Sequence, residues 1–380
     1  MAEDVDVVVV GLGVMGAATL AALARRGVRA VGLERFDVPH ALGSSHGGTR
    51  VIRKAYYEDP RYVPLLHRAW EAWRLLEEEV GERLLIQTGG LHFGPADHPD
   101  IQGVLDSVRL HGLAHELLDA RAIATRWPVF RPGESDLGVL EHDAGVLLAE
   151  RSVQALVEVA LRRGAGVYAR EDLLALDIDG PRVRLTTSRR ELTCRRVVLA
   201  LGPWWPEHAP IRAPVALQVE RQVQFWVRPA DPDAFRPGRF PVFLRFGDDL
   251  FYGLPEAHVP GLKVAAHHGG ELTSPARIDR DLRPEDEARV RQFLRAHLPS
   301  ADGPLLAARV CMYTNSADQH FVLGLHPDAP EVVVGAGFSG HGFKLAPVVG
   351  EILADYALDG ASPTSPELFA VTGSRSGARA

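Results

Sequence analysis

Cysteine is scarce in this sequence, and long apolar runs are missing from it. The 380 residues include two cysteines, Cys194 and Cys311, which are far apart and lack CxxC spacing. This scarcity excludes a disulfide scaffold and argues against a cysteine-based zinc site, so we expect no metal. No apolar run reaches the roughly 18 residues of a membrane span, and no signal peptide is evident at the start. The sequence therefore predicts a cytoplasmic protein that does not enter a membrane.

An excess of positive charge is missing as well. The 42 Lys and Arg residues are outnumbered by 49 Asp and Glu residues, which gives a formal net charge of -7. A nucleic-acid-binding surface is normally basic, so nucleic acid is not an expected partner. Hydrophobic residues at 46% and charged residues at 24% are typical of a globular protein, and this length favours two domains.

The N-terminal segment has the pattern of a βαβ unit. A β-branched run at 5–10 predicts a buried parallel strand, an Ala- and Leu-rich helix ends near Arg26, and a second strand is expected at 28–33. The turn between strand and helix is Gly11-Leu12-Gly13-Val14-Met15-Gly16, whose glycines allow close approach to a pyrophosphate at the helix N-terminus. Glu34 ends the second strand, where a carboxylate can bind a ribose. Together these features predict a dinucleotide site.

These residues alone do not separate FAD from NAD. We favour FAD because the segments expected to complete the site, near Gly202 and Gly335, lie far downstream. An extended cofactor that crosses a discontinuous domain would need such an arrangement. An NAD-dependent dehydrogenase and a flavin-binding protein without turnover remain alternatives at this point.

The rest of the chain indicates an α/β fold with a second domain. Helical periodicity recurs at 62–80 and 153–161, whereas alternating strands dominate 218–268. We expect a Rossmann-like FAD-binding domain, discontinuous in sequence, and a mainly antiparallel-sheet substrate domain, α+β overall. The expected boundaries are 1–86, 146–215 and 316–370 for the first domain, 87–145 and 216–315 for the second, and 371–380 for a flexible tail.

Three further motifs carry a resemblance to a known family. They are GSSHGGTRVIR at 43–53, CMYT at 311–314 and GAGFSGHGFK at 335–344. Their order and spacing, with the N-terminal glycine motif, resemble the monomeric sarcosine oxidase family, which includes N-methyltryptophan oxidase and pipecolate oxidase. The resemblance covers almost the whole chain and implies an FAD-dependent amine oxidase that acts as a monomer.

The resemblance also implies how the flavin is held. It places the isoalloxazine ring between the two domains and implies a thioether from its 8α carbon to Cys311, while Cys194 matches no motif and is expected to be structural. The cofactor-binding residues that follow from the motifs are Gly11, Gly13, Met15, Gly16, Glu34, Arg35, Ser44, Ser45, Thr49, Arg50, Cys311, Met312, Gly340, Gly342 and Lys344.

The catalytic roles are likewise implied by resemblance. Arg53 and Lys344 match the residues that bind the substrate carboxylate, for which a guanidinium fork and an ammonium are well suited. Lys263 resembles the oxygen-activating lysine, and His267, four residues later on the same strand face, resembles the active-site histidine. Arg50 is expected over the flavin, with Tyr252 and Tyr313 along the amine pocket.

The expected substrate is a small secondary amino acid. For sarcosine, oxidation by O2 would give glycine, formaldehyde and H2O2, and the alternatives are L-pipecolate, L-proline or a larger N-methyl amino acid. Gly48 and Lys54 occupy positions where sarcosine and N-methyltryptophan oxidases commonly carry Asp and His, and the segment 241–252 aligns poorly with the family. These departures leave the substrate side chain open.

Overall fold

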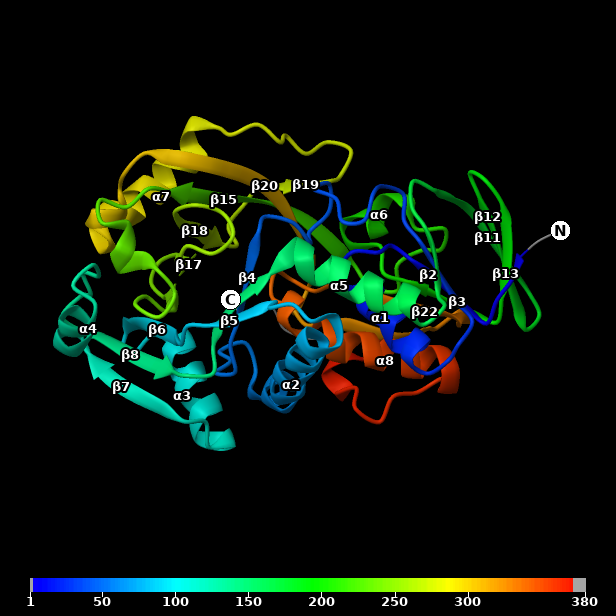
Figure 1. Cartoon of the computed structure of the whole chain (residues 1–380), viewed down its shortest axis with the longest axis horizontal. Helices are drawn as coiled ribbons and strands as arrows, with labels where there is room; N and C mark the ends of the chain where they lie inside the picture. The colour runs from blue at the N-terminus through cyan, green and yellow to red at the C-terminus, as the bar shows by residue number, and fades with distance from the viewer. Residues whose placement is uncertain (1–2, 372–380) are drawn as a thin grey trace.

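The structure, a computed structural model, describes residues 3–371. Four β-sheets and their helices build an elongated molecule (Figure 1). A six-stranded and a four-stranded sheet lie at one end of the long axis, and most of a nine-stranded sheet lies at the other. The functional residues must therefore be sought where these halves meet.

The six-stranded sheet contains the expected N-terminal strand near its centre. Strand β2 pairs in parallel with both of its neighbours, and its valines are buried on both faces of the sheet. Val7 and Val9 pack toward the helices, whereas Val8 and Val10 pack toward the four-stranded sheet, which explains the unbroken apolar run. In spatial order the strands are β10 (Gly166–Tyr168), β3 (Ala30–Leu33), β2 (Val7–Val10), β14 (Arg196–Leu199), β22 (Ala329–Ala336) and β21 (Val322–His326).

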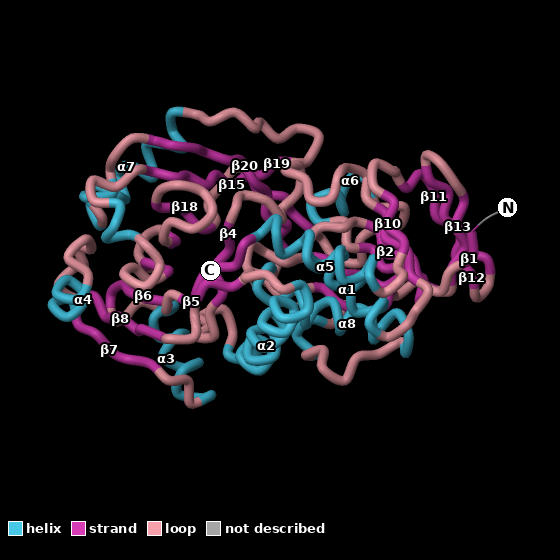
Figure 2. Tube along the Cα trace, in the orientation of Figure 1, coloured by secondary structure: helices cyan, strands magenta, loops and turns pink. Residues whose placement is uncertain are grey.

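Helices cover one face of this sheet, and Figure 2 shows them side by side. Helix α1 packs closely on α5 and α8 because its inner face is built from small side chains, among them Ala18 and Ala21. Gly27, with φ +73°, follows the end of α1, as the sequence predicts. The helices are α1 (Val14–Arg25), α2 (Val63–Val80), α5 (Ala149–Arg162) and α8 (Ala346–Asp359), and a short α6 (Trp205–His208) follows β14.

The four-stranded sheet covers the opposite face. Leu185 and Leu192 of this sheet share a core with Val8 and Val10, so the parallel sheet is enclosed between two layers. Its strands, in spatial order, are β1 (Glu3–Asp4), β13 (Glu191–Cys194), β12 (Arg182–Thr187) and β11 (Leu173–Asp179).

The nine-stranded sheet is drawn from two separate stretches of chain, within 90–141 and 217–316. Its ladders are antiparallel except for the parallel pair β6 and β16, which confirms the mainly antiparallel second sheet. The strands are β19 (Leu272–Thr273), β15 (Leu217–Val227), β18 (Leu262–His267), β17 (Leu250–Leu254), β16 (Val242–Arg245), β6 (Gly90–Pro95), β8 (Asp136–Glu141) and β7 (His115–Asp119), and β20 (Leu305–Ser316) pairs with β15. The exact domain boundaries stay a prediction, and 372–380 of the expected tail lie outside the described residues.

One face of the nine-stranded sheet carries an aromatic core. Phe243, Phe251 and Phe293 stack there, with ring centroids 4.1 Å apart for the last two. Side chains alternate along a strand, so Tyr252, which follows Phe251 in its strand, points to the other face of the sheet. The helices attached to this sheet are α3 (Pro99–His111), α4 (Ala120–Arg126) and α7 (Pro284–His297).

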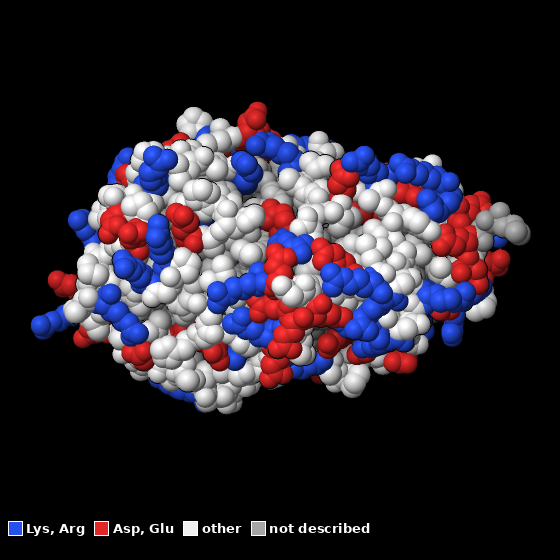
Figure 3. All heavy atoms as spheres, viewed as in Figure 1, with Lys and Arg blue, Asp and Glu red and all other residues white. Residues whose placement is uncertain are grey.

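A small three-stranded sheet joins the two halves. It contains β4 (Thr49–Ile52), β9 (Gly145–Leu148) and β5 (Leu85–Gln87), and β4 carries Arg50. On the face shown in Figure 3, acidic and basic side chains are intermixed. Glu79, for example, pairs with Arg25 and Arg163 and so ties α2 to α1 and to the end of α5. Within residues 3–371, no helix is both long and apolar enough to cross a membrane.

The close packing of α1 and α8 yields a testable prediction for Gly350→Ala. A Cβ at this position would lie 2.5 Å from the backbone carbon of Ala18 and 2.7 Å from its oxygen. Alanine favours a helix interior by about 1 kcal/mol over glycine, whereas overpacking a core costs about 1–3 kcal/mol. We expect the clash to dominate and the urea midpoint of unfolding to fall. A higher midpoint would mean that the two helices can move apart freely.

Candidate active site

One face of the nine-stranded sheet gathers the predicted catalytic side chains. Lys263 lies opposite Trp226 of β15, and Cys311 lies opposite Gln222 of the same strand. Positions 222 and 226 differ by an even number, so they and their cross-strand partners share one face. By the same alternation along β17, β18 and β20, this face carries Lys263, His267, Tyr252, Cys311 and Tyr313.

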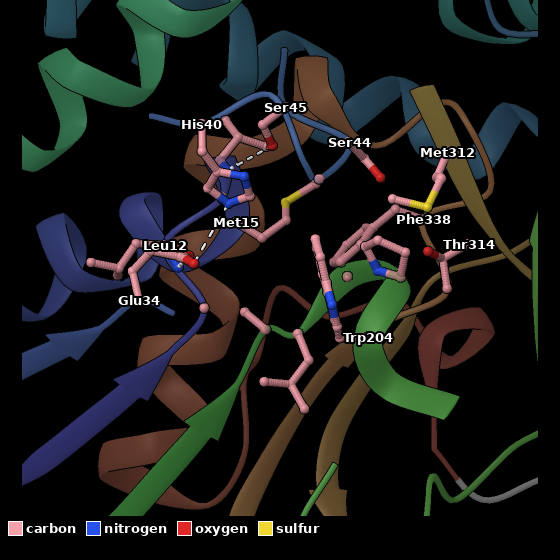
Figure 4. Close-up of a pocket in the computed structure, with 18 of the residues that line it drawn as sticks. Leu12, Met15, Glu34, His40, Ser44, Ser45, Trp204, Met312, Thr314 and Phe338 are labelled. Atoms are coloured by element: carbon pink, nitrogen blue, oxygen red, sulfur yellow. Dashed lines mark hydrogen bonds and ion pairs between the residues drawn. The ribbon is translucent and has the colours of Figure 1, made fainter. Parts of the chain in front are cut away.

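A cleft beside this face begins at the β2–α1 turn. Gly11 adopts φ +87°, and a Cβ there would lie 2.6 Å from Ala200 O, while a Cβ at Gly16 would lie 1.8 Å from Gly11 O. Both positions require glycine, and the turn leaves backbone exposed at the start of α1. Figure 4 shows Glu34 and His40 on one side of the cleft and Met312 and Thr314 on the other. An extended ligand could therefore contact segments that are far apart in sequence.

Glu34 closes one end of the cleft. Its carboxylate is buried and accepts hydrogen bonds from Leu12 N at 2.8 Å and Phe36 N at 3.0 Å. Burial alone would raise its pKa, but His40 and the two backbone donors outweigh burial and lower the pKa. An ionised acceptor at the end of β3 suits a ribose hydroxyl. Arg35 also lines the cleft and forms a half-exposed ion pair with Asp172.

The loop at 43–50 connects the cleft to the catalytic face. Ser45 Oγ accepts from Val14 N at 3.0 Å, at the first turn of α1. Arg50 donates to the carbonyls of Ser44, His46 and Thr49 at 2.6–2.8 Å, so its guanidinium folds the loop around itself. The loop thereby brings a permanent cation, Arg50, to the edge of the cleft.

Cys311 lies against this loop. Its thiol is buried, with Sγ 3.9 Å from the carbonyl oxygen of Ser44. Burial by itself would raise the pKa of the thiol, but His46 and the Arg50 guanidinium outweigh burial and lower the pKa to about 6. Cys194 shows the contrasting case, since burial raises its pKa to about 12. Cys311 is thus the cysteine suited to act as a nucleophilic thiolate.

Lys263 reaches the same loop from β18. Its Nζ donates to Gly47 O and to Thr49 O, each at 2.8 Å, and lies 5.0 Å from the centre of the Trp226 ring. Gly47 N and Gly48 N in turn donate to the carboxylate of Glu150. Burial, and after it the charge of Arg50, hold the pKa of Lys263 well below its ordinary value. Lys263 and Arg50 both donate to Thr49 O, and these two basic side chains are called the cationic spot beside the cleft.

His267 and two tyrosines occupy the other end of this face. His267 Nδ1 lies 3.1 Å from Tyr313 Oη, and its ring lies 6.2 Å from that of Tyr252. Burial, followed by the charges of His268, His341 and Lys344, keeps the pKa of His267 well below its usual value. Burial also raises the pKa of Tyr252 to about 12, so this tyrosine stays a neutral hydroxyl.

Arg53 and Lys344 form a second pair of basic side chains and lie close together. Both side chains are buried, and both cations contact the face of the Tyr56 ring, at 4.2 Å for Arg53 Cζ and 5.2 Å for Lys344 Nζ. Burial and then the charge of Arg53 lower the pKa of Lys344 to about 7. The same two charges also help to lower the pKa of His267, so the cation pair lies close enough to the histidine to act on it electrostatically.

Glu58 is the counter-ion of this pair. Both of its oxygens accept from Arg53 Nη2, at 2.5 and 2.7 Å. Burial would raise the pKa of Glu58, but Arg53, His341 and Lys344 outweigh it and lower the pKa to about 2. The sequence motifs did not include Glu58 or Glu150 and gave no role to His46, since each acts through a contact that spacing does not reveal.

The predicted cofactor residues fall into two groups. One group lines the cleft, and it consists of Gly11, Gly13, Met15, Glu34, Arg35, Ser44, Ser45, Arg50, Met312, Gly340 and Gly342. The other group, Gly16, Thr49, Cys311 and Lys344, is buried and does not line the cleft. Gly340 has φ +78°, and a Cβ there would meet the Tyr313 ring at 2.5 Å, so this glycine keeps the catalytic face open to the cleft.

The positions at which the sequence departs from the family are also visible. Lys54 points away to an ion pair with Asp143 at 2.7 Å and lies over Trp70. The segment 241–252 forms β16 and the first part of β17, and it ends at Tyr252 on the catalytic face. Within residues 3–371, His, Cys, Asp and Glu side chains form no group that could hold a metal ion.

The glycine turn, the ionised Glu34 and the Arg50 guanidinium in the lining of the cleft fit a flavin dinucleotide. A family model described as FAD dependent oxidoreductase matches residues 6–356. The chain belongs to this family. The NAD-dependent alternative is therefore wrong, and the protein is a flavoprotein amine oxidase that binds FAD.

Relatives of this oxidase match along nearly its whole length. The monomeric sarcosine oxidase of Streptomyces avermitilis is 37% identical, over 97% of each chain. The peroxisomal sarcosine oxidase of Homo sapiens is 34% identical, over 93% of this chain and 92% of its own. The N-methyl-L-tryptophan oxidase of Citrobacter koseri is also 34% identical, over 94% of this chain and 95% of its own. The expected resemblance to the sarcosine oxidase family is thus confirmed.

Solved structures agree with the fold. NikD, an unusual amino acid oxidase essential for nikkomycin biosynthesis, superimposes with a TM-score of 0.84 at 28% identity, over 97% of both chains. The L-proline dehydrogenase of P. horikoshii gives a TM-score of 0.84 at 21% identity, over 98% of both chains, and supports the fold alone. The expected two-part architecture of an FAD-binding oxidase is therefore confirmed.

Proposed function

We propose that this oxidase acts on a small secondary amino acid, with sarcosine as the first candidate, and passes the electrons to O2. The observation that carries the proposal is the buried pair Arg53 and Lys344, whose charges also help to lower the pKa of His267. Two cations so close together, with Glu58 as a counter-ion, favour an added carboxylate. We further propose that the enzyme acts as a monomer, as the names of several relatives state for them.

The same cations prepare the substrate nitrogen. A secondary amine must be neutral to be oxidised, because a protonated nitrogen has no lone pair to support the developing imine. Arg53 and Lys344 lower the pKa of a nearby amine through their positive charge. Tyr252 and Tyr313 lie beside His267 and could hold the amine by their hydroxyl groups. Bound FAD would accept the electron pair from the carbon beside nitrogen and deliver it to O2.

The second half of the reaction is assigned to the cationic spot of Lys263 and Arg50. O2 gains negative charge as it is reduced, and a positive group fixed in a buried site stabilises that charge without reorganisation. Two carbonyl oxygens hold Lys263 Nζ in place, each at 2.8 Å. L-Pipecolate, L-proline and larger N-methyl amino acids remain alternative substrates, because the residues described here bind the carboxylate and the amine and leave the side chain unspecified.

A peroxide assay tests the reaction. We expect H2O2 from sarcosine, or from one of the N-methyl amino acids, L-proline or L-pipecolate. Dimethylamine, a secondary amine without a carboxylate, should be at least about tenfold worse in kcat/KM, because it loses charge-assisted bonds of about 1.5–3 kcal/mol. The proposal is refuted if no carboxylated secondary amine yields peroxide, or if dimethylamine matches the best of them.

We also propose a covalent link from Cys311 to the flavin, supported by the lowered pKa of its thiol. Flavin-free protein mixed with FAD in air should acquire acid-stable yellow colour, and Cys311→Ser should not, whereas Cys194→Ser should behave like wild type. Air is needed because replacing a C–H bond of the 8α carbon by a C–S bond to the thiolate would release a proton and two electrons, which O2 would take up. The thiolate is the reactive form, so the rate should rise about tenfold per pH unit below the pKa and level off above about pH 6. A colourless acid pellet from wild type would exclude the link.

The role of Lys263 is tested by measuring the two half-reactions separately. Lys263→Met should slow reoxidation of the reduced enzyme by O2 by about a hundred- to a thousandfold, which is typical of losing one preorganised electrostatic contact. Anaerobic reduction by substrate should change far less. Lys54→Met is the matched control, since it removes another mostly buried lysine that pairs with Asp143 outside the site. Equal slowing of both half-reactions would assign Lys263 to the general structure of the site.

A further inference from the structure

Glu220 of β15 is a buried carboxylate that takes no part in the carboxylate-binding pair or the cleft. It is 5% exposed and accepts four hydrogen bonds. One oxygen accepts from Asn315 Nδ2 at 2.7 Å and His268 Nδ1 at 3.1 Å, and the other accepts from Gly270 N at 2.7 Å and Gln222 Nε2 at 2.8 Å. Burial would raise its pKa, but His268 and the other donors outweigh burial and lower the pKa, so Glu220 stays ionised.

These bonds fasten the turn that follows His267. His268 adopts φ +67°, which is unusual for a residue with a side chain, and a Cβ at Gly270 would lie 1.8 Å from Arg221 O. The turn leaves β18, which pairs with β15 at 225–227, and leads into β19, which pairs with β15 at 219–220. Glu220 thus holds the turn beside the stretch of β15 between these two ladders.

Glu220 also lies close to the contact between His267 and Tyr313. In the register of β15 and β20 it lies directly opposite Tyr313. The His268 ring, which donates to Glu220, lies 4.3 Å from the His267 ring and 5.2 Å from the Tyr313 ring. A shift of this turn would move His267 relative to the Tyr313 hydroxyl, which lies 3.1 Å from its Nδ1.

We propose that Glu220 is a positioning residue for oxidation of the amine, which acts through His268 and the Gly270 backbone to hold His267 against Tyr313. This inference rests on the proposed amine oxidation. This role follows from the four hydrogen bonds that Glu220 accepts. An ionised carboxylate can only accept, so His268 Nδ1, Asn315 Nδ2 and the other two groups all donate to it. Glutamine cannot replace it, because its amide NH2 would face two of these donors.

Glu220→Gln is the first test. A displacement of about 1 Å at a reacting centre can cost about a hundredfold, so we expect anaerobic flavin reduction at saturating substrate to slow by about ten- to a hundredfold. Reoxidation by O2 and the Kd of acetate as an inhibitor should not change, because Lys263 and the Arg53–Lys344 pair are not held by Glu220. The histidine NMR signal of His267 should shift, and that readout needs no turnover.

Two further variants keep the test decisive. His268→Asn removes the ring that joins Glu220 to His267, and asparagine tolerates the left-handed backbone at this position, so it should also slow reduction selectively. Asp136→Asn is the matched control, a buried carboxylate on β8 near the opposite edge of the same sheet, and it should leave both half-reactions and the His267 signal unchanged.

The outcomes separate this proposal from the proposed function. Wild-type enzyme that forms no peroxide from any secondary amino acid refutes the function, whatever the variants do. If wild type is active, the positioning role is overturned by normal flavin reduction and an unshifted His267 signal in Glu220→Gln. It is also overturned if Glu220→Gln and His268→Asn lose flavin or slow both half-reactions alike, because the carboxylate would then serve only the fold.

Discussion

The carboxylate of Glu150, at the start of α5, is the contact on which the rest of the site depends. It accepts from Gly47 N and Gly48 N, and these residues adopt φ +95° and +73°, a backbone conformation that favours glycine. Once the loop at 43–50 is held in this way, Ser45 meets the first turn of α1 and the Gly47 carbonyl meets Lys263. The FAD cleft and the catalytic face are thus joined by one loop, which Glu150 holds at its two glycines and Arg50 and Lys263 hold at its carbonyls.

The second constraint is the gathering of buried cations. Arg53, Lys263 and Lys344 are buried and Arg50 is partly buried, and an uncompensated charge in such surroundings costs several kcal/mol. The positive charges of these four side chains are compensated by different partners. Arg53 has Glu58, and Arg50, Lys263 and Lys344 have backbone carbonyls. Burial and the charge of Arg53 in addition lower the pKa of Lys344 to about 7. A substrate carboxylate, as proposed, would add negative charge to this arrangement and so link binding to the stability of the site.

Local pattern was enough to predict much of the fold. The apolar run, the glycine turn and Glu34 predict β2, α1 and β3 correctly, because each depends on neighbours close in sequence. The strands begin later than expected, at Val7 and Ala30, since the residues before them bond irregularly to Thr193 and Leu23. The parallel pairing of β6 with β16 was not predictable, because it joins segments about 150 residues apart that share no local signal.

The residues of the site also differ in whether the sequence alone could identify them. Residues inside family motifs, such as Arg53 and Cys311, could be identified from the sequence through the resemblance. Glu58, Glu150 and Glu220 could not, because a glutamate in a globular sequence is usually a solvated surface charge, and what sets these three apart is their burial and their partners. Glu150, for example, bonds to Gly47 across 103 positions of sequence. Such contacts follow from the packing of the finished fold and from sheet register.

Strand β18 places the two halves of the chemistry at its opposite ends. Lys263 lies at its start, beside the loop at 43–50, and His267 lies at its end, beside Tyr313. The two residues are four positions apart on an extended strand, which separates them by about 13 Å, and the even spacing puts both on one face of the sheet. The cation that would act on O2 and the histidine that would act on the amine are therefore held by one rigid element and yet have separate supports. Carbonyls of the loop hold the first, and the turn fastened by Glu220 holds the second. A change at one support can alter one half-reaction and leave the other intact, because the strand between them keeps its ladders with β15 and β17.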